Sequence, residues 1–209
     1  MKKIWRTFCM VCLILIVLCS FPLMTSAESS DIAEGIVHTS RGEVTWAIDK
    51  TGKLILTGIG EVSLQDGEKR VPWYEYRDQI FSAEIKTTNM KDASYLLAGC
   101  KRLRKVDLTE WDTAGMENAQ SMFLGCENLE SVDLSGKDFS NVQNMNGMFE
   151  GCIKVPNIDF SNVTTDSATD MGKLFCRCES LKILAIESFD IADVTNMSNM
   201  FDHCYQLEE

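Results

Sequence analysis

Histidine is scarce in this sequence, with 2 residues among 209, and the scarcity excludes much of enzyme chemistry. His38 and His203 lie far apart along the chain, which leaves little for acid–base catalysis by imidazole. The motifs G-x-S-x-G and H-E-x-x-H and a phosphate-cradling glycine loop are absent. The sequence also lacks the pair of C-x-x-C motifs that is typical of a zinc site. We therefore expect no enzyme, no cofactor and no metal site, and only paired carboxylates keep acid–base chemistry open.

Positive charge is also in short supply, with 20 Lys and Arg against 31 Asp and Glu and a net charge of −11. This acidity disfavours nucleic acid and anionic membrane surfaces as partners. The long apolar run lies near the N-terminus, between Phe8 and Phe21, after the basic residues Lys2, Lys3 and Arg6. Small residues follow at 25–27, so residues 1–27 are predicted to be a signal peptide. We expect an extracellular or cell-surface protein without stable membrane insertion after signal removal, and a retained N-terminal anchor is the alternative.

The cysteines show a repeat. Three of the 9 lie in the predicted signal, and five of the others are spaced by 26 residues: Cys100, Cys126, Cys152, Cys178 and Cys204. Disulfide scaffolds do not space cysteines so evenly, whereas repeat proteins do. The same period relates Phe123, Phe149, Phe175 and Phe201, and it relates Met145, Met171 and Met197; Met148 and Met200 are two periods apart. Residues 90–209 are therefore predicted to be 26-residue repeats.

Within one repeat, the apolar pattern changes its period. Met145, Met148, Phe149 and Cys152 are spaced as one face of a helix, with Gly151 available for a left-handed helix end. The run "SVDLS" at 131–135 alternates as a short strand does. Neither element can bury its apolar side alone, so the repeats must stack. The predicted fold is an α/β solenoid of short strands and short helices.

The sulfur-rich columns are best explained as the filling of a narrow solenoid core, since Met and free Cys both pack as adaptable apolar residues. Disulfides between neighbouring rungs are the alternative, because export makes oxidation available. Cys176 lies off the column and is the candidate reactive thiol. A polar column is expected to satisfy backbone groups at a turn; it comprises Asp92, Asn118, Asn144, Asp170 and Asn196.

The repeat, seen in "NMNGMFEGCIKVPNIDF" and "NMSNMFDHCYQL", resembles that of the BspA-like leucine-rich repeat group of bacterial surface proteins. The resemblance implies a right-handed leucine-rich-repeat-like stack. It also implies a secreted or surface interaction protein, adhesin-like, that binds a host or neighbouring-cell protein. The preceding "GEVTWAIDKTGKLILTGIGEV" reads as a hairpin, and with the segment at 71–80 it resembles the family's pre-repeat stretch. Residues 28–89 are thus expected to form a β-rich cap, with Trp46, Trp73 and Tyr74 as its lid.

A row of carboxylates on the outward side of the strands is the candidate ligand-binding feature. It comprises Asp107, Asp133 and Asp159, flanked by Thr109, Ser135 and Ser161. Neighbouring strands lie about 4.8 Å apart, so the row would bind a cation or a basic partner. The alternative is that each Asp bonds its local backbone or solvent. Ala185 interrupts the row in the next repeat.

Two further expectations concern other parts of the chain. A carbohydrate-binding module is the alternative function, in which exposed Trp111 and Tyr205 would stack on sugars. The chain stops at "CYQLEE" in the middle of a repeat, which suggests a fragment or an early stop. The open apolar end that results would favour aggregation or domain swapping.

Overall fold

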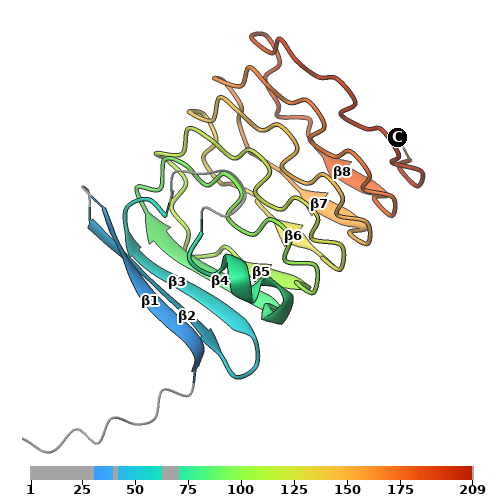
Figure 1. Cartoon of the computed structure of the whole chain (residues 1–209). Coiled ribbons are helices and arrows are strands. Elements are labelled where there is room, and N and C mark those ends of the chain that lie inside the picture. The colour runs from blue at the N-terminus through green and yellow to red at the C-terminus, as the bar shows by residue number, and fades with distance from the viewer. Residues whose placement is uncertain (1–30, 40–41, 63–70, 209) are drawn as a thin grey trace, which may run out of the picture. The chain divides into compact units, whose positions relative to one another are not determined.

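The computed structural model describes residues 31–39, 42–62 and 71–208, and the predicted signal peptide lies outside them (Figure 1). The strands and the one short helix of the described residues follow in chain order: β1 (Asp31–Thr39), β2 (Gly42–Asp49), β3 (Lys53–Ile59), the 3-10 helix η2 (Tyr74–Gln79), β4 (Ser82–Thr88), β5 (Lys105–Asp107), β6 (Val132–Asp133), β7 (Asn157–Asp159) and β8 (Ile183–Ala185).

The predicted hairpin forms from β2 and β3, which pair antiparallel with Trp46 opposite Leu56. Its turn is set by Asp49, whose Oδ1 accepts bonds from the backbone N–H of Thr51 at 2.8 Å and of Lys53 at 3.0 Å. Gly52 supplies the positive φ of 75° that the turn needs. β1 pairs with β2, and β3 pairs in parallel with β4, so a single sheet runs in the order β1-β2-β3-β4-β5. The N-terminal strands therefore continue directly into the strands of the repeats.

The expected lid residues belong to one core, and Trp73 joins the Trp46 side of the sheet to the first repeat. Trp73 is fully buried, and its ring lies 6.0 Å from that of Trp46. The Trp73 indole N–H donates to the Leu96 carbonyl at 2.9 Å. Tyr74 is half-buried and packs against the same core. This hydrogen bond links the segment that precedes the repeats to the first repeat.

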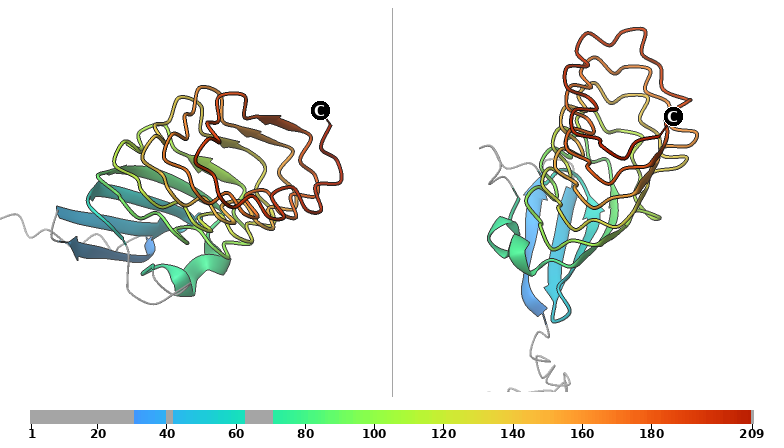
Figure 2. Two further views of the ribbon diagram at one scale, coloured as in Figure 1. Left: turned by 90° about the horizontal axis from the view of Figure 1, so that it is seen from above. Right: turned by 90° about the vertical axis from the view of Figure 1, so that its right-hand side faces the viewer.

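The repeats stack as predicted, one rung on the next, as all three views show (Figures 1 and 2). Parallel bridges join the polar column in succession from Asp92 to Asn196. In each of these residues the side-chain oxygen accepts a bond from the backbone N–H two residues later, at 2.9–3.0 Å. The polar column therefore fixes the turn that opens each rung.

The prediction of a short helix in each repeat is wrong, because the described residues contain no α-helix. In each rung, the segment where the helix was predicted contains two residues with positive φ, such as Gly147 (61°) and Gly151 (75°), and such residues interrupt a right-handed helix. The same conformation persists without glycine, at Arg177 (59°) and His203 (62°). Each rung instead forms consecutive turns, and this part of the rung is called the turn side below.

On the turn side, alternate N–H groups bond within the rung and between rungs. Met148 N–H donates to the Met145 carbonyl at 3.2 Å, while Phe149 N–H donates to Leu174 of the next rung at 3.0 Å. Because the interior positions of a helix face and of this turn coincide, Met145, Met148, Phe149 and Cys152 are all fully buried. The apolar periodicity predicted the buried residues correctly, but it predicted the wrong backbone conformation.

The core is built on stacked aromatic rings and thiols. The ring of Phe149 lies 5.0 Å from Phe123 and 6.0 Å from Phe175, in both cases nearly parallel. The six described cysteines are free thiols, so the disulfide alternative is not realised in this structure. Instead four of the five column thiols donate to a Phe or Leu carbonyl of the preceding rung: Cys126 to Leu97, Cys152 to Phe123, Cys178 to Phe149 and Cys204 to Phe175, at 3.1–3.3 Å.

The last rung departs from the predicted core. Met200 is buried and Cys204 is half-buried, but 43% of Met197 and 39% of Phe201 is exposed. Phe201 stacks on Phe175 at 5.6 Å, so it keeps its place in the column. It is exposed because no rung of the described residues covers its other face. The assignment of Met197 and Phe201 to the core is therefore wrong for this rung.

Candidate functional site

The strand side of the solenoid opens between β5 and β6. β6 and β7 pair at two positions, and Leu134 N–H donates to Asp159 O at 2.9 Å. β5 and β6 belong to different sheets, and the bridge that joins their rungs on this side pairs Lys105 with Ser131, the residue before β6. Leu108, which corresponds to Leu134, donates no such bond among the described residues. Two adjacent rungs that are closely joined on the turn side are therefore separated on the strand side.

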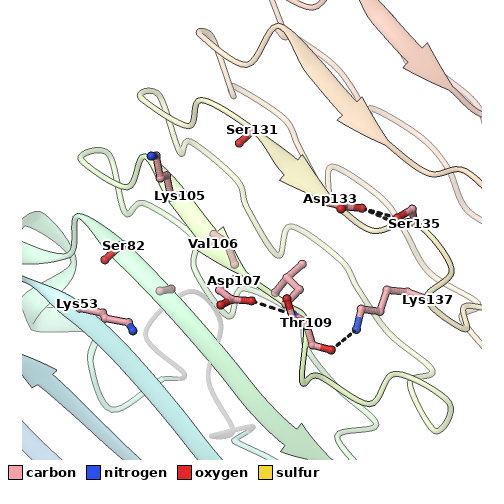
Figure 3. Close-up of a pocket in the computed structure, with 12 residues that line it drawn as sticks. Lys53, Ser82, Lys105, Val106, Asp107, Thr109, Ser131, Asp133, Ser135 and Lys137 are labelled. Atoms are coloured by element: carbon pink, nitrogen blue, oxygen red, sulfur yellow. Dashed lines mark hydrogen bonds between the residues drawn. The ribbon is translucent and has the colours of Figure 1, made fainter.

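A pocket of about 570 Å³ lies at this opening (Figure 3). Its floor is apolar, because Val106 is only half-buried here whereas its counterparts Val132 and Ile158 are buried. The volume is in the range of ordinary ligand sites. The lining is Lys53, Ser82, Ala83, Lys105, Val106, Asp107, Leu108, Thr109, Ser131, Asp133, Ser135 and Lys137.

The carboxylates of the pocket bond their own backbone. Asp107 Oδ1 accepts the N–H of Thr109 at 3.0 Å, and Asp133 Oδ1 accepts the N–H of Ser135 at 2.9 Å. The bond from Thr109, helped by the charges of Lys53 and Lys86, lowers the pKa of Asp107. Asp107 and Asp133 are nonetheless exposed. Each therefore keeps an acceptor oxygen, Oδ2, beyond the one used in its turn.

The lysines of the pocket differ in how they are held. Lys53 Nζ lies 2.5 Å from Glu84, and Lys137 Nζ donates to the carbonyls of Trp111 at 2.9 Å and Thr109 at 3.3 Å. Lys105 forms no ion pair within the described ranges. It is also exposed. Lys105 is therefore the lysine of this pocket whose ammonium group no described carboxylate or carbonyl holds.

The predicted site residues are only partly brought together. Asp107, Thr109, Asp133 and Ser135 line the pocket, whereas Asp159 and Ser161 do not. Asp159 bonds the N–H of Ser161 at 2.8 Å, as the local-backbone alternative expected, and its pKa is lowered by the Ser161 hydroxyl. Whether these residues bind a ligand remains a prediction.

Sequence reasoning missed Lys53, Lys105 and Lys137. The signal for one of them was available, because a residue two before Asp107 must lie on the same face of a strand. With these lysines, the charged residues of the site are of both signs rather than only acidic.

No group of three or more His, Cys, Asp or Glu side chains could hold a metal ion within residues 31–39, 42–62 and 71–208. The expectation of a cation on the Asp row is therefore not supported.

Comparison with known proteins places these repeats in a family. Residues 77–184 and 128–209 match the family described as "Mycoplasma protein of unknown function, DUF285". The chain belongs to the DUF285 family. The resemblance to BspA-like leucine-rich repeat proteins agrees with this membership.

A solved structure is also similar to this DUF285 protein: a leucine-rich repeat protein from Eubacterium ventriosum ATCC 27560. The sequence identity is 14% and the TM-score 0.36, with 77% of this chain and 45% of that chain covered. The present chain thus spans less than half of that protein. Comparison with curated proteins finds no match.

In this DUF285 chain the sequence "DHC" at 202–204 places an acid, an imidazole and a thiol side by side, but the structure joins only the acid and the imidazole. His203 Nδ1 lies 2.9 Å from Asp202. The Cys204 thiol points elsewhere and donates to the Phe175 carbonyl at 3.1 Å. Burial raises the pKa of Cys204, which is the opposite of what a nucleophilic thiolate needs. Cys176 is buried too, and burial raises its pKa in the same way.

The residues expected to stack on sugars are divided by the fold. Trp111 is only 2% exposed, so the prediction that it presents a ring to a glycan is wrong. It follows β5 and faces the core because the chain turns inward after Leu108. Tyr205 is 67% exposed, in the last rung. One exposed ring remains of the predicted pair.

Among the described residues, no helix is both long and apolar enough to cross a membrane.

Proposed function

We propose that this protein is a non-enzymatic secreted or cell-surface binding protein whose ligand is a protein of a host or neighbouring cell. The binding surface is the strand side of the solenoid around the β5–β6 pocket. The observation that carries the proposal is the pocket's lining, in which exposed charged and hydroxyl groups surround an apolar floor at an opening of the sheet. Such a mixture is typical of a recognition site.

Three other features support the proposal. The DUF285 repeat, like other solenoids, presents an extended surface of successive strands. The basic start and apolar run of residues 1–27 favour export. The thiols of the core donate to carbonyls and have raised pKa values rather than the lowered values of nucleophiles. These features favour adhesion or another form of protein binding over catalysis.

The proposal is tested by binding of fluorescently labelled protein to cells that have been treated with protease or with glycosidases. Protease treatment should remove the binding, and glycosidase treatment should leave it. The double variant Lys105→Glu, Asp133→Lys should bind at least tenfold more weakly than wild type. Equal binding by this variant would exclude the strand side as the binding surface, and loss of binding with glycosidase would favour the carbohydrate alternative.

The control exchanges the charges of an ion pair that lies outside the pocket. Lys101 and Glu127 are paired at 2.8 Å and are 60% and 40% exposed. The double variant Lys101→Glu, Glu127→Lys keeps both the net charge and an opportunity to pair. It should bind cells as wild type does.

A broad hydrolase screen on the same preparation tests the non-enzymatic part of the proposal, and substrate turnover would contradict it.

A further inference from the structure

The pocket has two charged ends. The backbone register places Lys53 beside Ser82, Ser82 beside Lys105, and Lys105 beside Ser131, which gives a row of lysines and hydroxyls across the strands. Two residues further along β5 and β6 stand Asp107 and Asp133. The Cα atoms of residues i and i+2 in a strand are about 6.6 Å apart. The pocket therefore presents a basic row and an acidic row at that separation.

The third lysine of the lining does not cancel this arrangement. Lys137 Nζ is held by the Thr109 and Trp111 carbonyls, beyond the acidic row (Figure 3). Lys53 is compensated by Glu84. Glu84 also pairs with Lys86 on the same strand, β4, and Lys86 pairs with Glu110, which lies in the turn after β5. The uncompensated polarity of the pocket thus runs along β5, from Lys105 to Asp107.

From this polarity we infer that the pocket recognises an extended segment of a protein partner that carries an acidic and a basic residue two positions apart. In an extended chain, side chains at i and i+2 point the same way and repeat at the same spacing of about 6.6 Å. The acidic side chain of the partner segment pairs with Lys105, and its basic side chain pairs with Asp107 and Asp133. This inference rests on the proposed function and specifies the chemistry of its ligand.

Other ligands with both charges fit less well. The charged groups of a free α-amino acid share one carbon and cannot span the two rows. Adjacent acidic and basic residues of an extended segment point to opposite sides. The apolar floor formed by Ala83, Val106 and Leu108 suits the aliphatic stems of Glu and Lys side chains, which pack on apolar surface while their charges stay in water.

The test uses two capped nine-residue peptides of identical composition, in a background of Thr and Val. One has Glu and Lys two positions apart, and the other has them adjacent. NMR titration of the 15N-labelled protein should give a dissociation constant at least tenfold lower for the first peptide. The shifts should centre on residues 105–109 and weaken with added salt. Equal affinity of the two peptides, or no binding of either, overturns the inference.

A charge exchange provides the second arm. Lys105→Glu replaces the unpaired cation of the basic row with an acid, so it should weaken binding of the Glu-x-Lys peptide at least tenfold and strengthen binding of a Lys-x-Lys peptide. Lys101→Glu makes the same charge change outside the pocket and should leave the affinity for both peptides unchanged. An equal response of the two variants contradicts the assignment of Lys105. The melting temperature of each variant checks that the exposed substitution leaves the fold intact.

The peptide and cell experiments fail separately. Cell binding that depends on Lys105 and Asp133, together with peptides that do not bind, would overturn only the acidic-x-basic ligand. Cell binding that ignores both residues would overturn the proposed surface.

Discussion

The two sides of each rung are built differently. On the turn side, backbone bonds, thiol–carbonyl contacts and the Phe stack join neighbouring rungs, as at Phe149 and Cys152. On the strand side the strands are two or three residues long in β5–β8, and β5 and β6 separate to form the pocket. The comparison shows that neighbouring rungs can stay joined along one side while the other side opens into a pocket.

The largest expected difference between the two sides is in packing. Phe149→Ala removes a fully buried ring between two parallel neighbours, and should lower the free energy of unfolding by about 3–5 kcal/mol. Ile183→Ala in β8 removes a side chain that is 66% exposed and should cost less than about 0.5 kcal/mol. Urea titration measures both. Similar costs would show that the turn side does not dominate stability.

The thiol column should give the next effect. Cys152→Ala removes a buried sulfur and its bond to the Phe123 carbonyl, at an expected cost of about 1–2 kcal/mol. Cys176→Ala is the matched control, since Cys176 is buried but lies off the column. It should be the milder substitution. The reverse order, measured by thermal unfolding, would argue against a structural role for the thiol–carbonyl bonds.

A smaller effect is expected at the glycines. A Cβ on Gly172 would lie 2.6 Å from the amide nitrogen of Asn196 and 2.8 Å from that of Asn146. These two amides both donate to Asp170, so Gly172→Ala should disturb the polar column and cost about 1 kcal/mol. Gly115→Ala meets nothing within 4 Å and should stay within about 0.5 kcal/mol of wild type. Equal melting temperatures would contradict this difference.

The smallest expected effect is the acid dependence contributed by the carboxylates of the strand side. The Thr109 N–H lowers the pKa of Asp107, and the Ser161 hydroxyl lowers that of Asp159. Because the folded pKa lies below the unfolded value of about 3.9, their contribution is present above that pH and is lost as the pH falls through the folded pKa. Asp107→Asn, Asp159→Asn should therefore flatten the stability curve below about pH 4. An unchanged curve would contradict the local bonds.

The repeat made most of the fold predictable, since a buried column must recur at the period of the rung. Phe123, Phe149 and Phe175 were identified in this way, as was the polar column, whereas the hairpin was predicted from two strand-like runs on either side of a turn. The backbone of the turn side could not be predicted from periodicity. A helix and a series of turns with left-handed residues bury the same positions, and Arg177 and His203 give no glycine signal.

The pocket was less predictable than the fold. Asp107 and Asp133 were found because they recur, whereas Lys105 and Lys137 occur once and no column points to them. The opening itself depends on the pairing between β5 and β6. A repeat pattern predicts that each pair of rungs is equivalent, so it cannot indicate the interface that differs.

The stacked core is tested most directly by contacts between Phe rings in solution. With selectively labelled Phe, nuclear Overhauser effects should join Phe123 to Phe149, Phe149 to Phe175 and Phe175 to Phe201, because those ring centres lie 5.0, 6.0 and 5.6 Å apart. Phe123 should show no contact with Phe175, which lies two rungs away. Contacts that skip a rung, or the absence of contacts between neighbouring rungs, would contradict a solenoid joined along its turn side.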